Sequence, residues 1–455
     1  MLILAVYLIL LLTLGVLDYR KIGNFQDYLL AGRRSGGLLV AFSLMASLIG
    51  SGSTMGLVNN VYRIGFPAFW FLAAGGIGLV LQSLVLSEKV RSTGAVSLPH
   101  LAEMVLGRPA AILIALIVAV TWIGIISAQF IAVGRLLTAL TGRESTLILP
   151  GAAAIIILYS FLGGQNSILK TDLLQQGILL AAVLVTLLWL YGTDPAVLSP
   201  ADFRPLNGEF GPGDLLYYLT LVMGSYFICP MMFSRLLSAR NPRTARRSSL
   251  AAGLVVLVFA LGLVLIGLWA RVKIPELSGG DVFSHLFLRV LPRGAGVLLL
   301  LGLLSAVIST VDTSLVMTAG IIEHDLLGKS RIGITRLLVL LLGIAGTAAA
   351  AGKSDIIGTL LEAFAVYTAG IVPVLFIALM FLRKRILNRP LAFSAVLLGG
   401  IAGAAANWTG IRNLALAGLA GSLLLALLAA GLGRPAEAAL PGEESSGSLG
   451  EKEAY

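Results

Sequence analysis

Thirteen apolar stretches of membrane-spanning length divide this chain, and only short segments separate them. A helix that crosses the hydrocarbon core of a bilayer needs about 20 mostly apolar residues. The chain is 58% hydrophobic and 12% charged, whereas soluble domains carry about 25% charged residues. We therefore expect an all-α membrane protein with about thirteen transmembrane helices. The stretches are 1–17, 38–58, 66–87, 109–139, 146–162, 166–192, 214–236, 248–270, 294–322, 335–352, 355–382, 390–407 and 412–432.

The distribution of Lys and Arg predicts how the chain is oriented in the membrane. Of the 32 basic residues, 22 lie in one set of alternating loops and 10 in the other. Loops rich in Lys and Arg stay on the cytoplasmic side. We expect a multi-pass protein of the cell (inner) membrane with its N-terminus outside and its C-terminus in the cytoplasm. Topology then explains the net charge of +10, and we expect no nucleic acid partner.

Residue patterns that indicate an enzyme or a nucleotide site are missing from the sequence. The single Cys229 allows no internal disulfide, and the three histidines show no metal-ligand spacing. Gly328-Lys329-Ser330 and Gly352-Lys353-Ser354 lack the earlier glycine that a phosphate loop requires. We expect no ATP binding and no enzymatic activity, so an ion gradient or the solute's own gradient must drive any transport.

Glycine and proline interrupt two of the apolar stretches. The stretch 38–58 contains Gly50–Gly56, and the stretch 214–236 contains Gly224–Pro230. Such residues weaken the helical hydrogen-bond ladder and free backbone carbonyls at membrane depth. Interrupted helices at corresponding positions of two repeats indicate the binding site of a secondary transporter. The alternative is close helix packing through small residues.

A polar stripe lies in the middle of the stretch 294–322, between Leu304 and Leu315. An Asp at the centre of a spanning helix costs about 2.5–3.5 kcal/mol on insertion scales, so Asp312 needs a partner or a function. One helical face carries Ala306, Ser309, Thr310 and Thr313. This face is a candidate cation site. In the alternative, the hydroxyls bond to their own helix carbonyls and Asp312 pairs with a neighbouring helix.

Several fragments, taken in their order along the chain, resemble the sodium/solute symporter family, whose members carry proline, pantothenate, monocarboxylates, sugars or sialic acid. Each fragment is short, but their order on a scaffold of this size is specific. The fragments are Tyr28–Arg33, Ser51–Gly56, Gly163-Gly164 followed by Thr171-Asp172 and Gln175, Pro230 with Arg235, Ala306–Thr310, and Glu323–Leu326.

The resemblance implies a LeuT-type fold, in which flanking helices accompany two inverted repeats of five helices each. It divides the chain into an N-terminal extra helix with its connector (1–37), the first repeat (38–192), the second repeat (193–382), two C-terminal helices (383–432) and a cytoplasmic tail (433–455). The tail is rich in Glu, Gly and Ser, and we expect it to be disordered.

The resemblance also implies sites for Na⁺. The main site takes the carbonyl oxygens of Ala46, Ile49 and Ala306 and the hydroxyls of Ser309 and Thr310. Some members bind a second Na⁺ through an aspartate that matches Asp172, with hydroxyls at the positions of Ser309, Asp312 and Thr313. Asp312 departs from the serine of those members. It could ligate the ion, stay protonated or pair with a basic group.

Solute contacts are expected at the two interrupted stretches. The candidates are Ser51, Ser53, Thr54 and Tyr226, followed by Gln82, Gln129 and Tyr367. Hydrogen bonding between helices is the alternative role of Gln129 and Tyr367. The short hydroxyls favour a small amino acid or carboxylate over a sugar. We expect Na⁺-coupled symport by alternating access; the alternatives are a proton-coupled symporter and a membrane sensor or regulatory protein on a transporter scaffold.

Overall fold

The computed structural model describes residues 25–196, 198–277, 281–382 and 385–435, together with Tyr7, Ile9 and Thr13. Within this part of the chain, 11 helices are long and apolar enough to cross a membrane, or up to 12 when one bent helix pair is counted as a span. The expected all-α membrane architecture is confirmed. The stretch 1–17 and the tail 433–455 lie almost entirely outside the described residues, so the prediction of a thirteenth span rests on the sequence.

Most spans are continuous helices whose ends lie within a few residues of the predicted ones. The stretch predicted at 166–192, for example, forms a helix from Gln165 to Thr193. The continuous helices are α5 (Phe69–Val85), α8 (Arg108–Thr141), α9 (Ser145–Leu162), α10 (Gln165–Thr193), α14 (Pro242–Lys273), α16 (Arg293–Ile321), α17 (Ile332–Ala350), α18 (Ile356–Met380), α19 (Arg389–Thr409) and α20 (Asn413–Gly431).

The first interrupted stretch is a broken helix, as its glycines predict. Helix α3 (Gly37–Leu48) ends at Ile49, whose φ of −91° and ψ of 81° leave the helical region. The chain then resumes as a π-helical turn, η2 (Gly52–Gly56), and as α4 (Leu57–Ile64). The two halves are bent by 65°. The break therefore frees the last carbonyls of α3 inside the protein.

The second interrupted stretch is broken just before Pro230. It begins with α11 (Pro212–Tyr217), η5 (Tyr218–Val222) and α12 (Met223–Phe227). Ile228 and Cys229 are extended, and α13 (Pro230–Ser238) starts with the proline. Proline is tolerated in the first turn of a helix, because its missing N–H has no partner there in any case.

Short elements join the spans. They are α2 (Phe25–Leu30), η1 (Ala31–Arg33), η3 (Phe66–Ala68), α6 (Ser87–Ser92), α7 (Leu98–Leu106), η4 (Pro200–Phe203), α15 (Val282–His285), η6 (Leu286–Val290) and η7 (Ile322–Leu326). Two short antiparallel strands, β1 (Arg385–Ile386) and β2 (Arg434–Pro435), join the two ends of the C-terminal helix pair.

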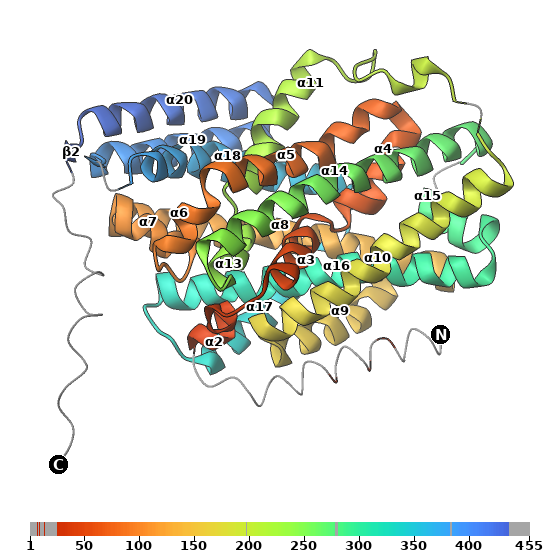
Figure 1. The fold of residues 1–455 in the computed structure, drawn as a ribbon, viewed down its shortest axis with the longest axis horizontal. Coiled ribbons are helices and arrows are strands. Elements are labelled where there is room, and N and C mark those ends of the chain that lie inside the picture. Colours follow the sequence, from red (N-terminus) through yellow and green to blue (C-terminus); the bar gives the residue numbers. More distant parts are fainter. Residues whose placement is uncertain are drawn as a thin grey trace.

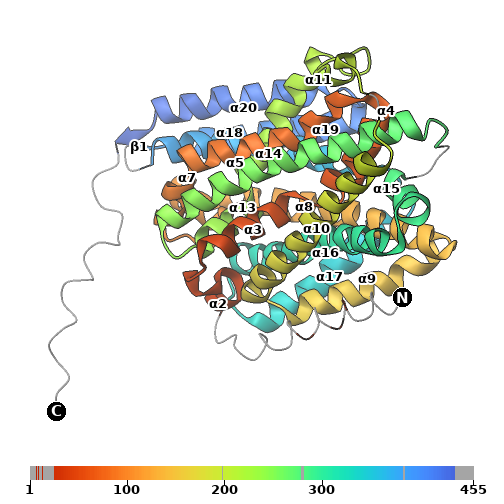
Figure 2. The ribbon, with the colours of Figure 1, turned by 45° about the vertical axis from the view of Figure 1, so that its right-hand side comes forward.

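The spans lie side by side in layers, with the broken helices inside. In Figure 1, α19 and α20 form one edge and α9 lies toward the opposite one, and Figure 2 shows the same order after a 45° turn. Helix α3 packs on α10, α14 and α16, while α18 packs on α8 and α19. Glycine permits the closest of these contacts: a Cβ at Gly399 would lie 2.0 Å from the carbonyl oxygen of Ala369. The contacts between α3 and α16 place the polar stripe of α16 beside the end of α3 at the first break.

Candidate functional site

Both broken helices line one cavity near the centre of the protein. Its polar lining comes from Ser47, Ser53, Gln129, Ser225 and Thr310, and its apolar lining from Leu48, Trp122, Ile125, Met231, Leu360 and Phe364. Gly50, Gly52, Tyr226 and Cys229 complete the wall. The free volume of the cavity is about 30 Å³, which holds about two water molecules. This space is too small for an organic solute, so the walls must move before a solute can bind.

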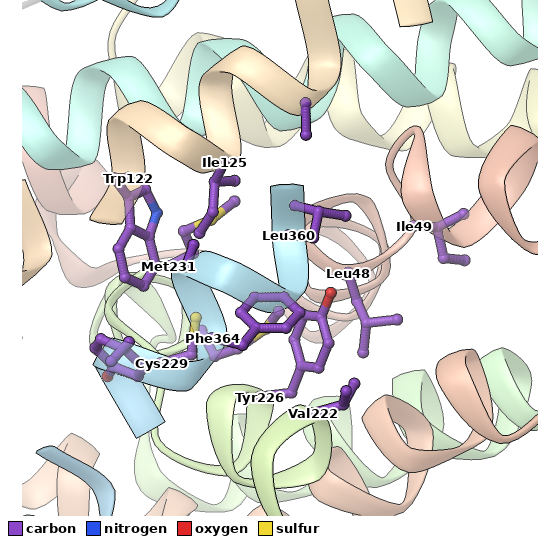
Figure 3. Packing of buried hydrophobic residues seen from close by; sticks show 14 of the residues in the cluster. Leu48, Ile49, Trp122, Ile125, Val222, Tyr226, Cys229, Met231, Leu360 and Phe364 are labelled. Carbon is purple, nitrogen blue, oxygen red and sulfur yellow. The ribbon is translucent and has the colours of Figure 1, made fainter. Parts of the chain in front are cut away.

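Aromatic and aliphatic side chains dominate the walls. In Figure 3, Trp122 and Ile125 extend from α8 and Leu360 and Phe364 from α18, while Tyr226 rises from α12. The rings of Tyr226 and Phe364 have centroids 5.6 Å apart in an edge-to-face contact. Such walls suit the apolar body of a small solute, and the few polar groups orient it.

Side chains satisfy the backbone groups that the first break frees. The Ser53 hydroxyl donates to the carbonyl of Leu48 at 2.8 Å, and the Thr54 hydroxyl donates to the carbonyl of Gly50 at 2.8 Å. The amide N–H of Ser51 donates to Oε1 of Gln129 at 2.8 Å. The hydroxyl of Ser51 points to the carbonyl of Ala128. Of these expected solute contacts, Ser53 and Gln129 line the cavity, whereas Ser51 and Thr54 shape the break beside it.

Gln82 and Tyr367, two other expected solute contacts, donate hydrogen bonds to backbone carbonyls at the second break. Nε2 of Gln82 donates to the carbonyls of Tyr226 and Phe227 at 3.3 and 2.9 Å. The Tyr367 hydroxyl donates to the carbonyl of Ile228 at 2.8 Å. These carbonyls have lost their helical partners, so both side chains replace backbone hydrogen bonds. Their direct contact with a solute stays a prediction.

The residues of the predicted main ion site come from α3 and α16, and the structure brings them together. The Thr310 hydroxyl lies 3.1 Å from the carbonyl oxygen of Ala46 and 3.0 Å from that of Ala306, and the Ser309 hydroxyl lies 3.1 Å from the latter. All four residues are buried. Ile49 is the residue at which α3 ends. Backbone carbonyls and hydroxyls are the hard oxygen donors that alkali and alkaline-earth cations prefer.

Gly50 lies between the predicted ion site and the cavity. A Cβ at Gly50 would lie 2.8 Å from Oγ1 of Thr310 and 2.9 Å from Oε1 of Gln129. The break thus passes between a proposed ion ligand and a side chain of the solute cavity. Only a residue without a side chain fits this position unless its neighbours shift.

A second polar cluster lies between α3, α10, α13 and α16. The Ser43 hydroxyl donates to Oδ2 of Asp172, and Nη2 of Arg235 lies 3.6 Å from the same oxygen. Arg235 also donates to the Thr313 hydroxyl, which is 3.4 Å from Oδ1 of Asp312. The predicted members of a second ion site are therefore neighbours, but a guanidinium is among them.

Sequence reasoning missed several of these residues. It named Arg235 with Pro230 as part of the family resemblance, but it also counted Arg235 among the basic loop residues. That count was wrong, because the side chain is completely buried. It also left out Ser43, Trp122 and Phe364. A basic residue shortly after an intramembrane proline was the available signal for Arg235. The other three are ordinary residues of apolar helices, and only packing shows their place.

Comparison with known proteins finds similar chains. A family model described as the sodium:solute symporter family matches residues 28–192. The chain is 27% identical over 416 residues to the sodium/proline symporter of Staphylococcus aureus strain JH9, across 82% of this chain and 80% of that protein. The relative from strain USA300 gives the same values, 27% identity over 416 residues.

Part of the chain thus matches the sodium:solute symporter family, and most of it is similar to sodium/proline symporters. The chain also shares its fold with solved structures. A Na⁺-coupled sialic acid symporter in a substrate-bound outward-open state matches with a TM-score of 0.81 at 16% identity, across 95% of this chain and 98% of that one. Mhp1, a nucleobase-cation-symport-1 family transporter, matches with a TM-score of 0.60 at 15% identity, across 88% and 92% of the two chains. The expected LeuT-type fold is confirmed.

Proposed function

We propose that this protein couples Na⁺ entry to the uptake of a small amino acid of zero net charge, with proline as the first candidate. The observation that carries the proposal is the cavity wall. Among the described residues that line it, none is Lys, Arg, His, Asp or Glu. A solute with a net charge would enter a buried site without a compensating group, which is costly. A zwitterion carries one positive and one negative charge, so it needs no charged group of the protein to compensate a net charge.

The cavity wall also has a place for each part of such a solute. The aliphatic body would lie between Trp122, Leu360 and Phe364. Its carboxylate would lie at Gly52 and Ser53, where the second half of the first broken helix begins. The N–H groups at a helix start carry positive partial charge and bind anions. A sugar is a poorer fit, because it needs hydrogen-bond partners on most sides.

The curated relatives support an amino acid as the solute. The proteins from Staphylococcus aureus that match most of this chain are named sodium/proline symporters. The cavity favours a neutral amino acid, and the names of the relatives select proline as the one to test first.

Na⁺ would bind where α3 ends against α16. The proposed ligands are the carbonyls of Ala46, Ile49 and Ala306 and the hydroxyls of Ser309 and Thr310. Because Gly50 packs on both Thr310 and Gln129, an ion at this site would set the shape of the break that the solute contacts. Entry of one cation across 100 mV releases about 2.3 kcal/mol. In our proposal the N-terminus is outside and the C-terminus cytoplasmic.

Uptake by proteoliposomes tests this function. An inward Na⁺ gradient should drive accumulation of labelled L-proline, and unlabelled neutral amino acids should compete better than pyruvate, sialic acid or glucose. Saturable Na⁺-driven uptake of an anion or a sugar, with none of an amino acid, would refute the proposed solute. Uptake driven by a pH gradient without Na⁺ would refute Na⁺ coupling in favour of protons.

Two phenylalanines of α18 provide a matched pair of variants. Phe364 lines the cavity, whereas Phe376 packs on Phe227 outside it, with ring centroids 5.6 Å apart. Phe364→Leu should raise the half-saturating proline concentration, and Phe376→Leu should leave it unchanged. Equal effects of the two changes would contradict the assignment of the cavity as the solute site.

A further inference from the structure

The indole ring of Trp122 forms part of the cavity wall and is held in place by its neighbours. Trp122 lies on α8, lines the cavity and is 2% exposed. In Figure 3 its nitrogen is on the edge of the ring that faces Ile125 and Leu360, which also line the cavity. The ring packs edge-to-face on Tyr367, with ring centroids 5.1 Å apart. Packing therefore fixes the direction of the indole N–H.

This N–H is a buried donor without a partner. Nε1 of Trp122 is buried and makes no hydrogen bond to any residue that the structure describes. Trp70 and Trp269, by contrast, each donate to a backbone carbonyl, at 3.1 and 2.7 Å. A buried donor that stays unpaired costs stability, and the indole N–H can only donate. The partner that Trp122 lacks is therefore a hydrogen-bond acceptor.

The hydroxyl groups of the cavity wall direct their protons away from a solute. Ser47, Ser53, Ser225 and Thr310 each donate to a backbone carbonyl, at 2.7 to 3.1 Å. Their oxygens can still accept a hydrogen bond, which suits the ammonium group of an amino acid. An acceptor in the side chain of the solute needs a different donor, and the N–H of Trp122 is available.

We infer that the N–H of Trp122 donates a hydrogen bond to an uncharged oxygen in the side chain of the solute. The inference rests on the proposed function, in which the carboxylate lies at Gly52 and Ser53 and the rest of the solute lies against Trp122. A carboxylate in the side chain does not fit, because none of the described residues that line the cavity is Lys, Arg or His.

The inference narrows the class of solutes. Among neutral amino acids, the protein should prefer those with an oxygen in the side chain over apolar ones of the same shape. Proline is accepted without this hydrogen bond. Trp122 is then a residue that determines specificity, and its ring provides the apolar contact for every solute.

Competition between amino acids of equal shape tests the inference. O-methyl-L-serine replaces one methylene group of L-norvaline by an ether oxygen, and O-methyl-L-threonine does the same to L-isoleucine. An ether oxygen accepts a hydrogen bond but cannot donate one. Each ether should inhibit the Na⁺-driven uptake of labelled L-proline into wild-type proteoliposomes at a concentration roughly tenfold lower than its hydrocarbon partner. Trp122→Phe should remove this preference.

Trp269→Phe is the matched control. Trp269 is also buried, at 4% exposure, and its N–H donates to the carbonyl of Asp194 outside the cavity. This variant loses an indole N–H as well, but it should keep the wild-type preference. A general loss of stability lowers the uptake of labelled proline without changing the ratio of two inhibition constants, so the ratio reports the contact itself.

Each outcome decides the question. Equal inhibition by ether and hydrocarbon in the wild type would overturn the inference and assign a water molecule to the N–H, and a preference that persists in Trp122→Phe would also overturn it. If Trp122→Phe is inactive, replacement of Trp122 by benzothienylalanine keeps the shape and exchanges only the N–H for sulfur, and the same loss of preference is expected. Wild-type protein that takes up no amino acid would instead refute the proposed function, so the two failures are distinguishable.

Discussion

Replacement of Thr310 by valine tests the main ion site with little change of shape. The Thr310 hydroxyl lies 3.1 Å from the carbonyl oxygen of Ala46 and 3.0 Å from that of Ala306. Valine keeps the branched side chain and removes only this oxygen. The proposed Na⁺ site then loses one of its two hydroxyl ligands while α3 and α16 keep their packing.

The expected effect on Na⁺ binding is large enough to measure. Contacts of a polar group with a charge contribute about 1.5–3 kcal/mol net, which corresponds to an increase of roughly 10- to 150-fold in the half-saturating Na⁺ concentration. The effect on stability is of similar size. The buried Ala46 carbonyl loses its hydrogen bond to Thr310, which costs about 1–3 kcal/mol.

Thr318→Val is the matched control on the same helix. Thr318 lies eight residues further along α16, or about 12 Å at the rise of an α-helix. It is completely buried, and its hydroxyl has no hydrogen-bond partner in the described part of the protein. Removal of that hydroxyl should be neutral or slightly stabilising.

Proline uptake as a function of Na⁺ concentration is the assay, with choline replacing Na⁺ so that ionic strength stays constant. Thermal unfolding in detergent confirms that both variants fold. Thr310→Val should shift the Na⁺ curve to higher concentration, and Thr318→Val should leave it in place. If both variants shift the curve equally, or if neither does, the reasoning about the ion site is refuted.

Two further predictions concern stability, and thermal unfolding in detergent measures both. Gly403→Ala should lower the free energy of unfolding by about 1–3 kcal/mol, because its Cβ would lie 2.4 Å from a backbone oxygen of α18. Gly177→Ala should instead raise the free energy of unfolding by about 0.5–1 kcal/mol, because nothing lies within 4 Å of its Cβ. A loss of stability in both variants would contradict the packing argument. Burial lowers the pKa of His100, and the nearby His324 lowers it further, so the unfolded chain binds more protons at this residue below a pH of about 6.5 and the contribution of His100 to stability falls on acidification. The hydrogen bond with Asp325 raises the pKa of His324, whose contribution has the opposite sign. The stability of His100→Gln relative to the wild type should therefore rise on acidification, and a constant difference would refute this reasoning.

The transmembrane helices and both of their breaks could be predicted from the sequence. Helix α10 was expected at 166–192 and extends from Gln165 to Thr193. Apolar length sets the span, and Gly50 and Pro230 mark the breaks through their own backbone chemistry. These are local properties, so no knowledge of the neighbouring helices is needed.

The content of the second polar cluster could not be predicted in this way. Arg235 read as a loop cation at the end of an apolar stretch, yet it is buried against Asp172 of another helix. The preceding Pro230 indicates that Arg235 lies near the membrane interior, but the partner of Arg235 depends on which helices α13 packs against. The positions of Trp122 and Phe364 in the wall of the cavity likewise depend on how the helices pack.

The proposed main ion site depends partly on the local sequence and partly on the tertiary structure. The sequence alone determined that Ser309 and Thr310 share a face of one helix, because that depends only on helical periodicity. The tertiary structure decided which oxygen lies opposite them. The carbonyl of Ala46 is available because α3 ends at Ile49, and it reaches Thr310 because α3 packs on α16. A backbone carbonyl has no residue type of its own, so only the packing of the two helices places it beside the Thr310 hydroxyl.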